Sequence, residues 1–311
     1  MNKNWLIPAP PGKELLSDIE KLGMELKLPC LVAELLYRKG IKTSSEAQEF
    51  FNPSMENLYD PFLFPDMEKA VQRILKAIDN KEKITIYGDY DVDGTTATAL
   101  LYLGLKRIGA NIDFYIPHRM IDGYGLSLTS LDTLRENGSS LIISVDCGVN
   151  AIEEINAINS MGMEIIITDH HNPKDELPPA FAIINPKLVG MKYPYEHLAG
   201  VGVAYKLLIA IYMKLGIDTA ENKLKYMDLV AVGTIADIVP LNSENRIFAS
   251  IGLQHLIEKK NLGLNALIQI SGLNQKNLDT SDIVFGIAPR INAAGRMGSA
   301  SVSVELLIST D

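Results

Sequence analysis

Cysteine is scarce in this chain of 311 residues, which contains only Cys30 and Cys147. The two cysteines lie far apart in the sequence and match no spacing that is typical of a zinc site or a redox motif. Disulfide frameworks belong mainly to proteins of oxidising compartments, so the sequence favours a reducing, cytoplasmic setting. Cys147 is interpreted as a small buried residue rather than a nucleophile, because no histidine partner is evident in the sequence.

Long apolar runs are missing as well. No stretch approaches the roughly 18 consecutive apolar residues that a membrane-spanning helix requires. The first residues also lack the apolar core and the small-residue cleavage site of a secretion signal. We therefore expect a cytoplasmic protein with no membrane partner. Its 47% of hydrophobic and 22% of charged residues are typical of a globular chain that buries a substantial core.

An excess of positive charge is absent too, since the formal net charge is -9. Taken alone, this charge disfavours a nucleic-acid partner, because phosphate backbones bind basic surfaces. A metal site, however, is itself built from carboxylates, and bound divalent cations would offset several of the negative charges. The nature of the partner must therefore be argued from the residues of the site.

Strands and helices alternate in the middle of the chain. Short β-rich runs begin near residues 83, 112, 141, 164 and 181, and most are followed by a pattern typical of a helix. This alternation predicts an α/β fold with a doubly wound, mostly parallel sheet. Apolar residues spaced three to four apart predict helices on both sides of this region. We expect a helical N-terminal segment at 1–80, a catalytic domain at 81–240 and a helical extension at 241–311.

Acidic residues follow three of the predicted strands. In chain order, the acidic and histidine residues at these strand ends are Asp89, Asp91, Asp93, Asp146, Asp169, His170 and His171. Ligands of open α/β sheets bind outside the carboxyl ends of the strands, so neighbouring strands would bring these groups into one crevice. A single aspartate after a strand more often caps a helix or forms an Asx turn. The whole set, in contrast, would repel itself without a counter-charge.

Divalent metal ions would supply that counter-charge. Aspartate and histidine ligands without thiolate suit manganese or magnesium better than zinc or cobalt, and two such ions about 4 Å apart can catalyse phosphoryl hydrolysis. Asp91 and Asp93 would point the same way from an extended strand, and each could take one metal. We expect Asp146 to bridge the metals and His170 to complete one ligand shell. Asp237, after a helical run, is a further candidate ligand.

Four segments in order, GDYDVDG, SVDCG, TDHH and GTIADIVPL, resemble the motifs of the DHH phosphoesterase superfamily. Flanking stretches such as DPFLFPDMEKAV and APRINAAGRMG resemble its RecJ branch, and the similarity extends from about residue 30 to the end. The resemblance implies a DHH phosphoesterase-like fold and two bound divalent metal ions, Mn²⁺ or Mg²⁺. It implies these metal ligands: Asp89, Asp91, Asp93, Asp146, His170 and Asp237. His171 would lie close to the scissile phosphate and act in catalysis together with Asp146.

One position departs from the superfamily pattern. Many members have a histidine four residues before the aspartate that corresponds to Asp91, where this chain has Tyr87. The resemblance then implies that one metal has fewer protein ligands and binds more weakly.

Basic residues in two further segments are candidates for binding substrate. The resemblance implies that Arg119 contacts the 5′ phosphate of a strand, and that Arg290, Asn292 and Arg296 line the substrate path. A guanidinium offers a planar fork that matches phosphate oxygens. The alternative for each arginine is a surface position in a salt bridge.

The resemblance implies a hydrolase of phosphodiester bonds: a 5′→3′ exonuclease that degrades single-stranded DNA to 5′ mononucleotides in DNA repair and recombination. It also implies a single-strand-binding protein or a helicase as a protein partner. Two alternatives stay open, a phosphodiesterase of short oligonucleotides or cyclic dinucleotides and a non-catalytic DNA-binding relative. The chain ends at Asp311 without a glycine- and histidine-rich motif, so we expect it to be the catalytic part of a longer protein.

Overall fold

The computed structural model describes residues 12–118, 123, 125–258, 261–297 and 300–310. The chain divides into two compact units, residues 1–54 and 55–311. The expected domain boundaries at residues 80 and 240 stay a prediction. Among the described residues, no helix has both the length and the apolar character that crossing a bilayer requires.

The first unit is a small helical cluster. Its helices are α1 (Lys13–Leu26), α2 (Cys30–Arg38) and α3 (Ser44–Phe51). They bury a few apolar side chains against one another, among them Leu22 and Leu36. Helix α3 begins with a capping box, in which the Thr43 side chain accepts from the Glu46 backbone N–H and the Glu46 carboxylate accepts from the Thr43 N–H. This pairing satisfies two N–H groups that the first turn of a helix leaves free.

The second unit is built on a five-stranded parallel sheet in the order β2-β1-β3-β4-β5. The strands are β1 (Lys83–Gly88), β2 (Asn111–Tyr115), β3 (Leu141–Val145), β4 (Glu164–Thr168) and β5 (Ala182–Ile184). Parallel strands are covered on both faces, which explains why β3 and β4 are continuous apolar runs. The predicted α/β fold with a doubly wound sheet is confirmed. Because the chain moves from β1 to β2 on one side and then to β3 on the other, the strand order reverses between β1 and β3.

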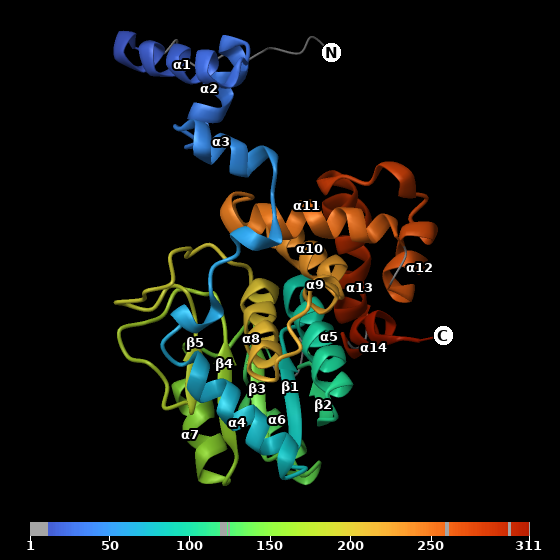
Figure 1. Ribbon diagram of the computed structural model, residues 1–311. Helices are drawn as coiled ribbons and strands as arrows, with labels where there is room; N and C mark the ends of the chain where they lie inside the picture. The colour runs from blue at the N-terminus through green and yellow to red at the C-terminus, as the bar shows by residue number, and fades with distance from the viewer. Residues whose placement is uncertain (1–11, 119–122, 124, 259–260, 298–299, 311) are drawn as a thin grey trace. The chain divides into compact units, whose positions relative to one another are not determined.

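Helices cover both faces of this sheet (Figure 1). The longer helices before residue 217 are α4 (Met67–Asp79), α5 (Val92–Arg107), α6 (Leu128–Glu136), α7 (Ile152–Ser160) and α8 (Gly200–Lys214). The later ones are α9 (Ala220–Leu224), α10 (Met227–Ala236), α11 (Ser243–Ile257), α12 (Leu262–Ile270), α13 (Ala288–Met297) and α14 (Ser301–Ile308). A π-helical turn (Asp282–Ile287) leads directly into α13, and 3₁₀ turns occur at Met55–Asn57, Pro61–Leu63 and Gln275–Asn277. Helices α4, α5 and α8 pack on one face, and α6 and α7 on the other.

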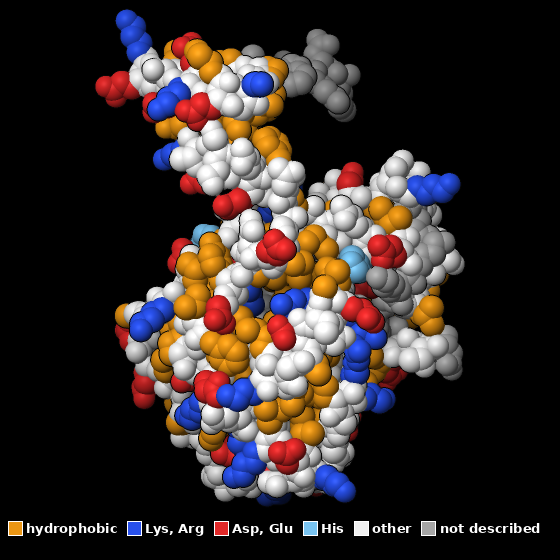
Figure 2. Space-filling model, viewed as in Figure 1, with side chains coloured by type: hydrophobic (Ala, Val, Ile, Leu, Met, Phe, Trp, Pro, Cys, Tyr) orange, Lys and Arg blue, Asp and Glu red, His pale blue; other side chains and the backbone are white. Residues whose placement is uncertain are grey.

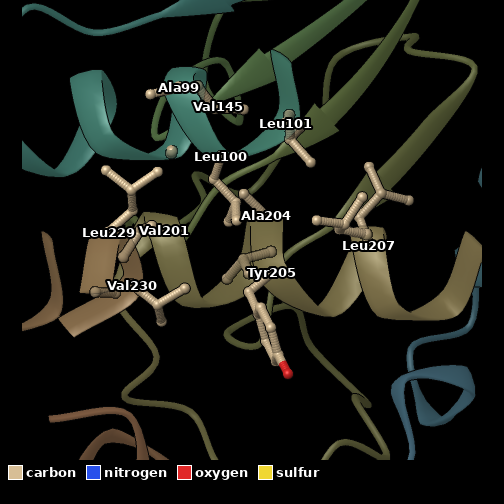
Figure 3. Close-up of a cluster of buried hydrophobic side chains, with 14 of the residues drawn as sticks. Ala99, Leu100, Leu101, Val145, Val201, Ala204, Tyr205, Leu207, Leu229 and Val230 are labelled. Atoms are coloured by element: carbon tan, nitrogen blue, oxygen red, sulfur yellow. The ribbon is translucent and has the colours of Figure 1, made fainter. Parts of the chain in front are cut away.

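The larger core lies where α5 crosses α8 and α10 (Figure 3). Leu100 and Leu101 of α5 face Ala204 and its neighbours on α8, and all of these side chains are buried. Gly104 allows the close approach of the two helices, because a Cβ there would lie 2.5 Å from a methyl carbon of Leu208. Truncating a buried leucine such as Leu100 to alanine would cost about 2–5 kcal/mol. This packing holds the amino-terminal ends of α5 and α8 next to the carboxyl ends of β1 and β3.

Candidate metal centre

The carboxylates after β1 lie at the point where the strand order reverses. Asp89 follows the strand directly, and Asp91 is the N-cap of α5, since its Oδ1 accepts a 2.9 Å hydrogen bond from the Gly94 N–H. Asp93 lies in the first turn of the helix. The expectation that Asp91 and Asp93 share one face of an extended strand is therefore wrong. Capping by Asp91 turns the chain into a helix at Val92, so the two carboxylates diverge.

Three groups of side chains bring their ligand atoms within 4.8 Å of one another. One group is Asp89, Asp91 and Asp146, the second is Asp93, His170 and Asp237, and the third is Asp146, His170 and His171. The first two groups together contain all six expected metal ligands. His170 connects Asp146 to the second group, because its Nε2 lies 3.0 Å from Asp146 Oδ1 and 3.7 Å from Asp237 Oδ2. Asp146 thus stands between two candidate metal positions, although its role as a bridging ligand stays a prediction.

Glycines allow the backbone to approach this centre closely. A Cβ on Gly94 would lie 2.6–2.8 Å from backbone atoms of Asp89. A Cβ on Gly200 would lie 2.5 Å from Asp146 Oδ1. Real Cβ atoms do not approach other atoms so closely, so a side chain at Gly94 would displace the backbone of Asp89, and one at Gly200 would displace the carboxylate of Asp146.

The centre carries more negative charge than its surroundings neutralise. Burial, followed by the nearby charge of Asp91, raises the pKa of Asp89 and of Asp93 to about 7. Burial also raises the pKa of Asp237 to about 7 and that of Asp146 well above its usual value, with the charge of Asp93 adding to both. Both carboxylate oxygens of Asp89 are buried and, among the described residues, have no hydrogen-bond partner.

A divalent cation fits these observations. Unpaired buried carboxylate oxygens are costly in the interior of a protein unless they coordinate a metal or a counter-ion. The donors are carboxylate oxygens and an imidazole without thiolate, a set that suits hard or borderline cations such as Mg²⁺ and Mn²⁺. The amino-acid side chains present therefore fit the predicted metals.

Asp93 is held by the start of another helix. The Gly200 N–H donates to Asp93 Oδ2 at 2.6 Å, and the Val201 N–H donates to Asp93 Oδ1 at 2.8 Å. These bonds place the buried carboxylate at the positive end of the α8 dipole, which favours its charged form. The two bonds lower the pKa of Asp93, but burial outweighs them. Helix α8 therefore orients this candidate ligand.

Asp169 orients the two histidines and was not assigned a role from the sequence. Its Oδ1 accepts from the backbone N–H groups of His170 and His171 and lies 2.7 Å from His171 Nδ1. Its Oδ2 accepts from the Val149 N–H. The hydrogen bond to Asp169 raises the pKa of His171, which favours the imidazolium form. The signal for this role was local, since an aspartate side chain commonly accepts hydrogen bonds from the backbone N–H groups of the residues that follow it.

A cavity of about 260 Å³ opens beside His171. Gly125, Leu126, Cys147 and Asn150 line it together with His171. Cys147 is buried, and burial, reinforced by the surrounding carboxylates, raises the pKa of its thiol well above the usual value. The thiol is thus kept neutral, in agreement with the interpretation of Cys147 as a buried residue rather than a nucleophile.

The expected substrate-binding residues are only partly described. Arg290 lies exposed in α13, with Nη1 donating to the Gly286 carbonyl oxygen at 2.7 Å, and Asn292 is half-buried in the same helix. Arg119 and the side chain of Arg296 lie outside the described residues. Helix α13 approaches the centre through Gly295, because a Cβ there would lie 3.5 Å from the carbonyl oxygen of Tyr90. The binding role of all four residues stays a prediction.

Residues 83–234 match the model of the DHH family, N-terminal domain. The chain is 42% identical to the single-stranded-DNA-specific exonuclease RecJ of Bacillus subtilis, over 99% of this chain and 38% of that protein. It is 36% identical to the Escherichia coli protein of the same name, over 93% of this chain and 51% of that protein. The chain thus spans about half or less of the length of these relatives.

Solved structures give the same match. The crystal structure of RecJ from Thermus thermophilus in complex with Mn²⁺ superposes with a TM-score of 0.80 at 30% identity, covering 97% of this chain and 42% of that one. A structure of exonuclease RecJ bound to manganese superposes with a TM-score of 0.71 at 35% identity, covering 79% of this chain and 61% of that one.

Proposed function

We propose that the chain, whose residues 83–234 match the model of the DHH family, is the catalytic part of a metal-dependent exonuclease. It hydrolyses phosphodiester bonds of single-stranded DNA from the 5′ end and releases 5′ mononucleotides. The observation that carries this proposal is the pair of ligand groups. One group contains Asp146, and the other contains His170, which lies next to Asp146. The choice of substrate is supported by the names of the relatives, which are 36–42% identical over most of this chain.

Each side chain of the centre has a distinct task in this proposal. Asp89, Asp91 and Asp146 would hold one divalent ion, Mn²⁺ or Mg²⁺, and Asp93, His170 and Asp237 would hold the other. When bound, the two ions supply Lewis-acid activation of water and neutralise charge on the phosphate. Asp169 fixes the His171 ring and favours its protonated form. His171 then donates a hydrogen bond, and finally the proton, to the leaving oxygen.

The face of the molecule that Figure 2 shows has, among the described residues, no large basic patch of the kind that binds DNA. Acidic and basic side chains of the described residues are interspersed there, rather than gathered into one basic stripe. We assign recognition of the strand to the centre and to α13, with Arg290 and Asn292 on the path of the strand and Arg119 and Arg296 completing it. We further propose that the protein acts in DNA repair and recombination in the cytoplasm. Its protein partner there is a single-strand-binding protein or a helicase.

Degradation of end-labelled oligonucleotides tests this function. With Mn²⁺, a 5′ label should appear at once in mononucleotides, while a 3′-labelled strand should shorten progressively, and a chelator should abolish both. Removing a residue that only orients a metal ligand lowers activity by up to roughly 100-fold. Asp146→Asn should lower the rate of hydrolysis by more than this. The control is Asp175→Asn, at an exposed position outside the three ligand groups, which should keep its rate. Near-normal turnover by Asp146→Asn, or early release of a 3′ label, would contradict the proposal.

A further inference from the structure

Tyr87 is a fully buried tyrosine of β1 that belongs to none of the ligand groups. It pairs across the sheet with Tyr115, and their rings stack with centroids 5.3 Å apart. The side chain lies in the core on the α6 and α7 side, opposite the face that packs on α5. The ring therefore has a packing role that any aromatic residue of the same shape could fill.

The hydroxyl of Tyr87 has a different task from its ring. It donates a 3.0 Å hydrogen bond to the carbonyl oxygen of Gly125, and Ser130 Oγ lies 3.2 Å from it. The Ser130 hydroxyl donates its hydrogen to the Ser127 carbonyl oxygen at 2.6 Å, at the start of α6. A small buried network thus connects strand β1 to the segment that precedes α6.

That segment forms one wall of the cavity beside His171. Gly125 and Leu126 line the cavity together with Asn150 and its neighbours, and Leu126 is almost fully buried. Gly123 and Gly125 both have positive φ angles, 80° and 75°, a conformation that glycine adopts freely. Glycine also loses more conformational entropy than other residues when it is ordered. The buried hydrogen bond from Tyr87 to Gly125 therefore helps to set the position of the wall.

The size and place of the cavity indicate what it would hold. Its volume of about 260 Å³ is below the roughly 300–1,000 Å³ of sites that enclose whole drug-sized ligands. It is too small for a length of strand, so at most one nucleotide unit would enter it. Because His171 and Asp169 line it, a nucleotide in this cavity lies directly next to the group that our mechanism places on the leaving oxygen.

We propose that Tyr87 is a positioning residue whose hydroxyl fixes the Gly125–Leu126 wall, so that the cavity holds one nucleotide of the strand beside His171. This inference rests on the proposed function. The hydroxyl contributes to binding of the strand, and it leaves the metal centre and the chemical step unchanged.

Tyr87→Phe removes the hydroxyl and keeps the ring, and Tyr212→Phe is its matched control. Tyr212 is also fully buried, and its hydroxyl donates to the carbonyl oxygen of a glycine, Gly104, at 3.2 Å in the contact between α5 and α8. Both variants therefore lose one buried bond of the same kind, and thermal unfolding should shift by similar amounts. Only Tyr87→Phe should raise KM for a single-stranded oligonucleotide, by about two- to tenfold, the equivalent of one net hydrogen bond.

The measurements are kcat, KM, inhibition by dTMP and calorimetric Mn²⁺ affinity for the wild-type chain and both variants. For Tyr87→Phe we expect KM and the dTMP inhibition constant to rise together, with kcat and Mn²⁺ affinity unchanged; Tyr212→Phe should keep all four values. An active wild-type chain with unchanged KM in Tyr87→Phe would overturn this inference alone. A fall in kcat or in Mn²⁺ affinity without a rise in KM would also overturn it. A wild-type chain that binds Mn²⁺ and hydrolyses no DNA would overturn the proposed function, and the inference with it.

Discussion

Replacing Asp89 by asparagine should stabilise the metal-free protein and destroy its metal site. The Asp89 carboxylate is 1% exposed, and its two oxygens are buried without a hydrogen-bond partner among the described residues. Its pKa is raised from 3.8 to about 7, first by burial and then by the charge of Asp91. The asparagine side chain has nearly the same shape and no charge, so it imitates the protonated acid at every pH.

The sign of the effect follows from proton linkage. The pKa of the folded state lies above that of the unfolded state, so the folded protein binds the proton more tightly. The contribution of the protonated Asp89 carboxyl to the free energy of unfolding is therefore fully present below about pH 4, and it is lost as the pH rises towards about 7. Each pH unit in this window costs about 1.4 kcal/mol. Ionisation of Asp89 alone should cost the wild-type protein at most about 2 kcal/mol by pH 5.5 and about 4 kcal/mol by pH 8. Asp89→Asn should be spared this part of the loss.

Thermal unfolding in the presence of a chelator measures this difference. A domain of this size shifts its Tm by about 2–4 °C for each kcal/mol, so the advantage of Asp89→Asn should be roughly twice as large at pH 8 as at pH 5.5. Saturating Mn²⁺ should reverse the order, because it raises the Tm of the wild-type protein and leaves the variant almost unchanged. Asp175→Asn, at an exposed site, is the control. An advantage that does not grow with pH would refute the reasoning.

Two further substitutions test how the backbone positions the centre. The buried amide of Asn245 donates to the carbonyl oxygens of His197 at 2.6 Å and Pro240 at 3.1 Å, connecting the segment before α8 to the turn after α10. Asn245→Ala should therefore weaken Mn²⁺ binding by about tenfold in calorimetry, and unchanged affinity would show that the turn holds its position unaided. Gly200→Ala places a methyl group 2.5 Å from Asp146 Oδ1, so it should abolish Mn²⁺ binding in a protein that still unfolds cooperatively; normal affinity would contradict the geometry.

The sequence predicted the strands well because their signal is local. Runs such as KITIYG and EIIIT are short, apolar and rich in β-branched residues, and they became β1 and β4. The acidic residues after them could be placed at one edge of the sheet, since parallel strands end on the same side. The order of the strands has no local signal. Only the folded chain shows that β1 and β3 are neighbours and that Asp89 and Asp146 therefore meet.

Other features of the centre depend on contacts between distant segments. The spacing of Asp91 and Asp93 fits both a strand and the start of a helix, and the capping bond to Gly94 decides between them. The bond between Tyr87 and Gly125 joins residues 38 positions apart, for which no spacing rule exists. A residue that can cap a helix is visible in the sequence, but tertiary packing decides which of several possible local structures forms.

Strained backbone and buried carboxylates lie together at the centre, and metal binding there should stabilise the folded state. Asp146 and Ile238, the residue after Asp237, both have φ angles of 60°, and left-handed backbone is unusual for a β-branched side chain such as isoleucine. Each such residue costs about 1–3 kcal/mol and persists only where the surroundings determine it. Hydrogen bonding holds both backbones, through the Asp146 N–H to Thr168 and the Ile238 N–H to Ile235. The fold thus keeps two strained residues and several charged, buried carboxylates in one place. Cations that bind there relieve the carboxylate repulsion in the folded state alone, so they should stabilise it by mass action.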